Sequence, residues 1–202
     1  MPIPLEDHVR QILLENKRGA KFHYAISEGW KAFNEGYPQR HIWRRKSSSR
    51  HIVWEEIVKR LINIAADDNE IQVIEHRDTI SLVVEHEVLF RVKHADTSLL
   101  TANYPTGVAK EFDDHSVDLY GFKGLQRVRL CYVPDQFQTN LLWSGVAATN
   151  NGNFLWKIEL DGFGAIAAPE RLPLPETTAN TSKLAKLKPG SQNARKKDDE
   201  AG

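Results

Sequence analysis

The spacing of apolar residues changes near Asp67, and this change constrains the fold more than any other feature of the sequence. Up to residue 66, apolar side chains recur every three or four positions, which is the period of an amphipathic helix. From Asp67 onward they recur at every second position in short runs, which is the period of a β-strand. The sequence therefore predicts an α+β fold, in which N-terminal helices pack on an antiparallel sheet of about six strands.

Three helices are predicted in the first third of the chain. The first two carry the apolar patterns Leu5, Val9, Ile12, Leu13 and Ile26, Trp30, Phe33. Gly19 is expected to end the first helix, and Tyr37-Pro38 follows the second, because proline disfavours helical backbone at the residue before it. The third and longest helix is marked by Val53, Ile57, Leu61 and Ile64. Ser49 is its expected N-cap.

Six strands are predicted in two meanders. They lie at residues 71–76, 79–84 and 88–93 and at residues 126–133, 138–148 and 153–160. Asn151-Gly152 supports the left-handed backbone of a type I′ turn, so a tight hairpin is expected between the last two strands. In the last strand, the side chains expected to face the core are Phe154, Trp156, Ile158 and Leu160, whereas Lys157 and Glu159 are expected to face water.

The length and composition predict one domain followed by a tail. Of the 202 residues, 41% are apolar, which is enough for a real core. We expect residues 1–66 to form the helical part and residues 67–164 the β part of the same domain. Residues 165–202 are rich in prolines, small polar residues and charge runs, and they bury too little apolar surface to offset the entropy of ordering. We predict a disordered tail, in which residues 166–174 are best suited to dock.

Two features favour a cytoplasmic protein. Cys131 is the only cysteine, so an internal disulfide is excluded and a reducing compartment is expected. The first residues lack a basic flank followed by an apolar run, and no stretch approaches the roughly 20 apolar residues of a membrane span. We therefore expect neither a signal peptide nor a membrane association.

The net charge is zero, but the charges are distributed unevenly along the chain. Residues 1–66 carry a net charge of +5, residues 67–162 carry −7, and residues 163–202 carry +2. Such an asymmetry either steers a charged partner or draws one part of the molecule toward another.

The most basic stretch, residues 40–50, contains five cations and no acidic residue. The candidate nucleic-acid-binding residues are its cations and its tryptophan: Arg40, Trp43, Arg44, Arg45, Lys46 and Arg50. The cations suit contacts with phosphates, and Trp43 suits stacking on a base. The alternative, which the zero net charge favours, is that this basic segment docks on the acidic middle of the same chain or on a protein partner.

The sequence predicts no catalytic residue, no metal site and no cofactor. His86-Glu87 is not followed by a histidine at the HExxH spacing, and the eight histidines are interpreted as solvated or hydrogen-bonded side chains. No base is identifiable by spacing for a serine nucleophile at residues 47–49. Cys131 is interpreted as a packed thiol. The acidic cluster is interpreted as a solvated loop or helix face, and it comprises Asp113, Asp114, His115 and Asp118.

Four pieces of the sequence form a recognisable pattern. They are Arg50-His51, Phe90-Arg91-Val92-Lys93, Asn103-Tyr104-Pro105-Thr106 and Trp156-Lys157-Ile158-Glu159-Leu160. Across residues 28–162, this pattern resembles a family of small bacterial accessory proteins that are associated with ImmA/IrrE-type neighbours. Those neighbours join a helix-turn-helix DNA-binding domain to a zinc-peptidase-like domain. The pairs look like toxin-antitoxin modules, some of them connected to phage defence.

The resemblance implies that the chain is a non-enzymatic, antitoxin-like regulator that binds a helix-turn-helix/zinc-peptidase-like protein encoded nearby. Because the chain lacks HExxH, it would be the partner and not the peptidase-like member. The residues expected to bind this partner are Arg91, Lys93, Asn103, Tyr104 and Thr106. Tyr104 is the expected anchor, because an aromatic side chain on a loop beside a basic strand suits an interface.

Overall fold

The fold comes from a computed structural model, which describes residues 3–99 and 106–164. The predicted tail at residues 165–202 and the candidate residues Asn103 and Tyr104 lie outside the described residues. The helical and β parts of the chain belong to one compact unit. Among the described residues, no helix combines the length and the apolar character needed to cross a membrane.

Three long helices form the first part of the fold, namely α1 at Glu6–Leu14, α2 at Arg18–Gly36 and α3 at Lys46–Ala66. Asn16 and Lys17 bend the chain between α1 and α2, because both adopt left-handed backbone, with φ of 48° and 55°. The prediction that Gly19 ends the first helix is therefore wrong. Gly19 lies in the first turn of α2, where Phe163 packs so closely that a Cβ atom would have no room.

The connection between α2 and α3 is short and partly helical. Helix α2 ends at Gly36, where the sequence predicts a helix end, and a 3-10 turn, η2 at Arg40–Ile42, precedes α3. The prediction that Ser49 caps α3 is wrong, because the helix already begins at Lys46 and Ser49 is buried within it. The cap residue Arg45 makes no side-chain hydrogen bond to the helix end.

The described residues contain one six-stranded sheet, with the strands in sequence order. Its strands are β1 at Ile71–His76, β2 at Thr79–Val84, β3 at Val88–His94, β4 at Gln126–Pro134, β5 at Leu141–Asn150 and β6 at Asn153–Glu159. Neighbouring strands are antiparallel except β3 and β4, which are parallel. The predicted α+β fold, with N-terminal helices packed on an antiparallel sheet of about six strands, is confirmed, although the parallel β3–β4 pair departs from it.

The parallel pair needs a crossover from the end of β3 back to the start of β4. The described parts of this crossover are residues 95–99 and 106–125, which include the short helix α4 at Gly107–Asp113. Phe112 of α4 packs with Val83 and Leu89 of the sheet. The crossover therefore covers one face of the sheet, and the long helices cover the other.

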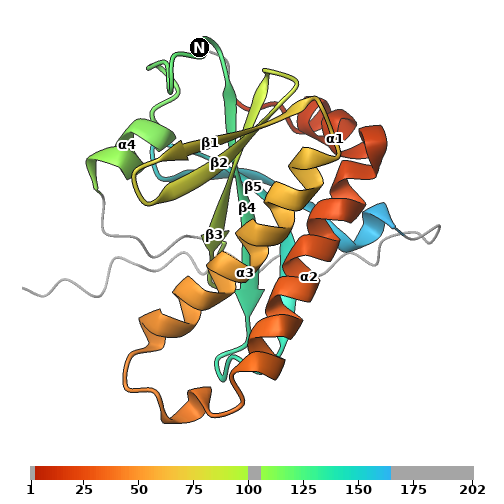
Figure 1. Cartoon of the computed structure of the whole chain (residues 1–202). Helices are drawn as coiled ribbons and strands as arrows, with labels where there is room; N and C mark the ends of the chain where they lie inside the picture. The colour runs from red at the N-terminus through yellow and green to blue at the C-terminus, as the bar shows by residue number, and fades with distance from the viewer. Residues whose placement is uncertain (1–2, 100–105, 165–202) are drawn as a thin grey trace, which may run out of the picture. The chain divides into compact units, whose positions relative to one another are not determined.

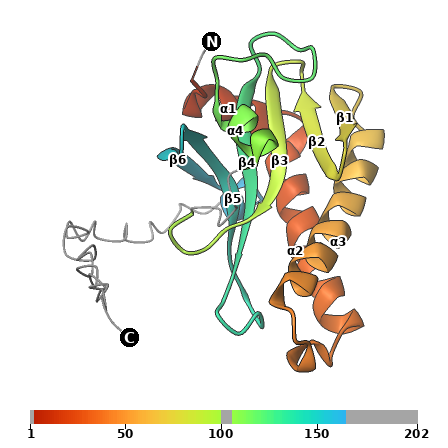
Figure 2. The same cartoon turned by 90° about the vertical axis from the view of Figure 1, so that its left-hand side faces the viewer.

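The main core lies between the sheet and the three long helices (Figure 1). Figure 2 shows the strands with α2 and α3 along one side of them. Phe22 of α2 contacts Phe90 of β3 edge to face, with ring centroids 5.4 Å apart. Because side chains alternate along a strand, Arg91 and Lys93 project to the opposite face of the sheet from Phe90 and Val92.

Strand β6 departs from the predicted alternation at one end. Ile158 and Leu160 are buried in the core as predicted, but Phe154 is 41% exposed. The register shifts between the pairs Ala148–Trp156 and Thr149–Phe154, so Leu155 is an extra residue in β6. One extra residue moves the side chains before it to the other face of the sheet. This bulge explains why the prediction for Phe154 is wrong.

Candidate functional site

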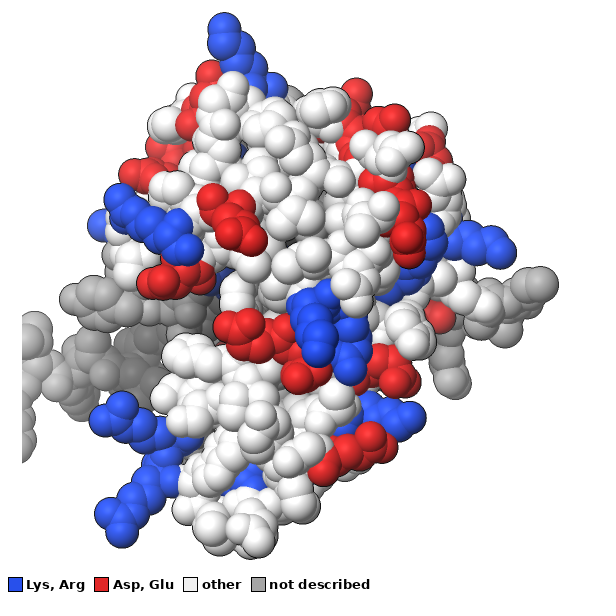
Figure 3. Space-filling view, viewed as in Figure 1, with Lys and Arg blue, Asp and Glu red and all other residues white. Residues whose placement is uncertain are grey.

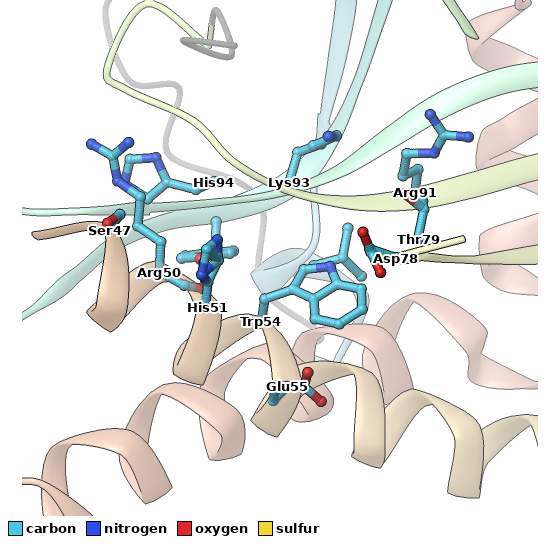
Figure 4. Close-up of a pocket in the computed structure, with 12 residues that line it drawn as sticks. Ser47, Arg50, His51, Trp54, Glu55, Asp78, Thr79, Arg91, Lys93 and His94 are labelled. Carbon is cyan, nitrogen blue, oxygen red and sulfur yellow. The ribbon is translucent and has the colours of Figure 1, made fainter. Parts of the chain in front are cut away.

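A cleft of about 610 Å³ opens where β3 extends beyond β2 (Figure 4). One wall is the first half of α3, a second is the β1–β2 turn, and the third is the end of β3. Its volume lies within the range of about 300–1,000 Å³ that is usual for ligand sites. We call this site the α3–β3 cleft.

The end of the β2–β3 pairing creates the opening. The two strands pair from Val84–Val88 to Ser81–Arg91, and no pair is formed beyond Arg91. The first residues of β2, Thr79 and Ile80, pair only with β1, whereas β3 continues to His94 in its ladder with β4. Strand β3 therefore has one uncovered edge, and this edge faces the cleft.

The helical wall of the cleft has a regular spacing. It is lined by Ser47, Arg50, His51, Trp54 and Glu55. These positions follow the i, i+3, i+4, i+7, i+8 pattern, which places them on one face of α3. Trp54 is partly buried against the main core. The hydroxyl of Tyr132 on β4 donates to the backbone carbonyl of Arg50 at 3.3 Å, which holds this part of α3 against the sheet.

Arg91 lies at the strand side of the cleft and is only 2% exposed. Its Nη2 donates to the Tyr120 hydroxyl at 2.7 Å, and its guanidinium carbon lies 4.2 Å from the centre of the Phe112 ring. These partners are neutral. Burial lowers the pKa of Arg91, although Tyr120 partly opposes this shift. The charge is thus held in place by groups that do not neutralise it.

Lys93 is the least compensated charge of the cleft. It is half-buried, and burial, together with the nearby charges of Arg91 and Arg129, lowers its pKa. Within the described part of the chain, Lys93 forms no hydrogen bond or ion pair. The charge of Asp113 opposes this lowering of the pKa only in part, and Asp113 is itself bound by Arg129 at 2.6 Å. An anion placed beside Lys93 would therefore relieve an electrostatic cost that the folded chain carries.

His94 lies beside Arg50 at the cleft and packs edge to face against Tyr132, with ring centroids 5.5 Å apart. Burial lowers the pKa of His94, and the charge of Arg50 lowers it further. The imidazole is therefore neutral at pH 7. In Figure 4, Arg50 and His94 lie at one end of the cleft and Arg91 and Asp78 at the other.

Two arginines behind the cleft were not identified from the sequence. Arg127 and Arg129 alternate with Val128 and Leu130 along β4, just as Arg91 and Lys93 alternate with apolar residues along β3. This alternation of arginines with apolar residues is the sequence signal from which Arg127 and Arg129 could have been identified. Arg127 donates to the carbonyls of Glu111 and Asp114, at 2.6 and 2.8 Å, and so fastens the crossover to the sheet.

The structure divides the predicted partner-binding residues. Arg91 and Lys93 line the cleft. Thr106 has a structural role, because its side-chain oxygen accepts a hydrogen bond from the backbone N–H of Ala109 and caps α4. Asn103 and Tyr104 lie outside the described residues.

The predicted nucleic-acid-binding residues are divided as well. Arg40 donates to the carbonyls of Asn34, Tyr37 and Gln138, and Trp43 packs against Phe33 and Tyr37, so both support the α2–α3 connection. Arg50 lines the cleft. Arg44 and Arg45 are exposed, and nothing is described of the Lys46 side chain. Figure 3 shows basic side chains that project from the surface at the end of the molecule where α2 and α3 are connected.

The expected docking of the basic segment on the acidic middle of the chain gains no support from these contacts. The partners of Arg40 are backbone carbonyls. In the part of the chain that the structure describes, Arg44, Arg45 and Arg50 form no ion pair with a carboxylate. Their charges are therefore available to a partner.

The remaining chemical groups have structural partners. Asp113 binds Arg129 and accepts from the Thr149 hydroxyl, and His115 bonds to the Thr149 carbonyl at 2.9 Å. The acidic cluster thus ties the crossover to the sheet and is not merely solvated. Cys131 is a packed thiol, and its burial raises the pKa to about 12, so the thiol is protonated at neutral pH. No group of three or more potential metal ligands is found among the described residues.

Comparisons with protein families, with curated proteins and with solved structures found no match to this chain. Its function is therefore inferred from the fold and the cleft: an α+β protein with a cationic cleft at an open strand edge.

Proposed function

We propose that the protein is a non-enzymatic regulator that holds an acidic segment of a partner protein in the α3–β3 cleft. The observation that carries this proposal is the half-buried ammonium of Lys93, which has no carboxylate partner among the described residues. The more specific form follows the sequence resemblance. In that form the chain is an antitoxin-like partner of a helix-turn-helix/zinc-peptidase-like protein encoded nearby, in the cytoplasm of a bacterium and in a module connected to phage defence.

The electrostatics of the cleft favour an anionic occupant. Lys93 and Arg91 share one end of β3, and the side chain of Arg50 reaches the same cleft from α3. Burying such charges without partners lowers the stability of the free protein. A carboxylate from a partner would replace the water that these groups lose and would form charge-assisted hydrogen bonds. The stability lost in the free state is then regained in the complex.

The side chains around the cleft favour binding over catalysis. Ser47 forms no hydrogen bond to His51 or to any other base among the described residues. Cations and aromatic surface dominate the lining, which is the composition of an interface anchor. Glu55 and Asp78 lie on exposed positions of the lining and leave the cations of β3 unpaired.

Co-expression with the neighbouring protein tests the proposal. We expect a complex that is stable on gel filtration, relief of growth inhibition if the neighbour is toxic, and about tenfold weaker binding for each of Lys93→Gln and Arg50→Gln. Lys31→Gln is the matched control, because Lys31 is an exposed lysine of α2 outside the cleft. The proposal fails if no complex forms, or if all three variants bind as well as the wild type.

A nucleic-acid-binding role through Arg44, Arg45 and Arg50 is the second candidate, because their charges are available. If these residues contact phosphates, DNA or RNA binding will weaken steeply with salt, and the double variant Arg44→Ala/Arg45→Ala will flatten the slope of log K against log salt by about two units. Weak binding at all salt concentrations, unchanged in the variant, would exclude this role.

A further inference from the structure

We propose that the acidic segment binds as an added β-strand along the open edge of β3 at Val92, Lys93 and His94. This inference rests on the proposed function and specifies how the cleft recognises its partner. It predicts that recognition depends on the peptide backbone as well as on charge, and that the bound segment is extended.

The first support is the uncovered backbone of β3. If the β2–β3 register continued, Ile80 would face Val92 and Thr79 would face Lys93, but neither pair is formed. Among the described residues, Val92, Lys93 and His94 form ladder pairs with β4 alone, and their backbone makes no hydrogen bond to a turn or loop. Unpaired strand edges are templates for an incoming strand, because each backbone N–H and C=O needs a partner.

The second support is the position of the cations. Successive side chains of a strand point to opposite faces of the sheet. A strand beside β3 would therefore direct every second side chain toward Arg91 and Lys93, and the others toward Arg50, His51 and Trp54 on α3. The free edge and the unpaired charges thus select the same ligand, an extended segment with acidic side chains at alternating positions.

The dimensions limit the length of the segment. Three backbone positions, Val92 to His94, span about 10 Å at about 3.3 Å per residue. A volume of about 610 Å³ suits a segment of a few residues and not a whole domain. Asp78 at the β1–β2 turn and Glu55 on α3 disfavour an acidic side chain next to them, so the acidic side chains of the ligand should lie on the face that Lys93 occupies.

The probe for this inference is a capped hexapeptide of alternating glutamate and threonine, added to the full-length protein. We expect binding, together with at least tenfold slower hydrogen exchange for amides among Val92, Lys93 and His94. N-methylation of every second peptide residue removes the donors on one edge of the strand. One of the two alternating N-methyl sets should weaken binding at least tenfold, and the other should leave it nearly unchanged.

Two control experiments test the charge. The Lys93→Gln protein should bind the glutamate peptide about tenfold more weakly, whereas Lys31→Gln should bind it normally. A hexapeptide of alternating lysine and threonine should not bind.

Other outcomes overturn the inference. If both N-methyl sets weaken binding equally, or if the peptide binds without slowing exchange at residues 92–94, the cleft recognises charge without strand addition. Equal binding of the lysine peptide, or no binding of the glutamate peptide, also overturns it. In each of these cases a partner protein whose binding depends on Lys93 leaves the proposed function standing. The proposed function itself fails if binding of the partner protein does not depend on Lys93.

Discussion

Arg18 at the start of α2 donates through Nε to the Asp68 carboxylate at 2.8 Å, just beyond the end of α3. The two side chains are 1% and 3% exposed. Arg18 also binds Glu85 in the turn between β2 and β3. One buried guanidinium therefore ties two helices to the sheet, at the end of β2 opposite to the one where the cleft opens.

Removing this guanidinium should strongly destabilise the fold. Arg18→Met leaves the buried carboxylate of Asp68 without its partner, and breaking a buried ion pair in this way costs about 3–5 kcal/mol. Urea unfolding of the two proteins measures the loss. Arg10→Met is the control, because Arg10 pairs with Glu6 on an exposed turn of α1, and its change should stay below about 1 kcal/mol. Similar stabilities for both variants would contradict the assigned role of Arg18.

The same contact predicts an acid-labile fold. The hydrogen bond from Arg18 lowers the pKa of Asp68 despite its burial, whereas the unfolded carboxyl titrates at about 3.9. The unfolded state then binds more protons, so this contribution to stability is present above about pH 4 and is lost as the pH falls through the lowered pKa of the folded state. Burial opposes a lowered pKa at Glu85, but its hydrogen bonds to Arg18 and Glu15 outweigh burial and lower the pKa. The hydrogen bond to Glu85 raises the pKa of exposed Glu15, so Glu15 opposes the loss of stability in acid.

Urea midpoints from pH 6 to pH 3 test the acid dependence. Because Asp68→Asn removes the carboxyl whose pKa shift creates it, the variant should lose less stability on acidification than the wild type. At pH 6 the variant should already be the less stable protein. Parallel curves for the two proteins would assign the acid sensitivity to other carboxyls.

Local sequence patterns predicted the strands well, because the signals for them are local. The ranges of β1 and β2 match the predicted runs, and Asn151 and Gly152 both have the positive φ that a type I′ turn requires, 49° and 79°. Helix ends were predicted less well. Gly19 resembles a stop signal, but its small size serves the contact with Phe163, and that contact joins residues far apart in the sequence.

A second close approach predicts a packing defect. A Cβ atom on Gly29 of α2 would lie 2.7 Å from a side-chain carbon of Ile57 and 3.0 Å from its backbone nitrogen, so α2 and α3 would have to separate. Gly29→Ala should therefore destabilise the protein by about 1–3 kcal/mol in urea unfolding. Gly36→Ala is the control, because nothing lies within 4 Å of the added atom. Unchanged or raised stability is expected there; equal stability of both variants would contradict the close packing.

The sequence identified three of the twelve residues that line the cleft and could not reveal its shape. Arg91 and Lys93 were candidates, and Arg50 was a candidate for a different role. Their meeting depends on where the β2–β3 pairing ends, and the register of two strands is a non-local property. The helical wall could have been found in the spacing of Arg50, His51 and Trp54, but that spacing alone does not say what α3 faces.

Lys93 should oppose stability while it supports binding. Burial lowers its pKa, so the native state binds fewer protons than the unfolded state, whose lysine titrates at about 10.4. The penalty is therefore present at neutral pH and fades as the pH rises toward that value. Lys93→Met should raise stability at pH 7 by about 1 kcal/mol, which corresponds to about 2–4 °C in Tm, and the gain should shrink by pH 10. Lys31→Met, on exposed α2 surface, should show neither effect. Thermal unfolding at pH 7 and pH 10, together with a measurement of partner binding, tests this prediction. If Lys93→Met is less stable than the wild type at pH 7, Lys93 already has its counter-charge within the chain.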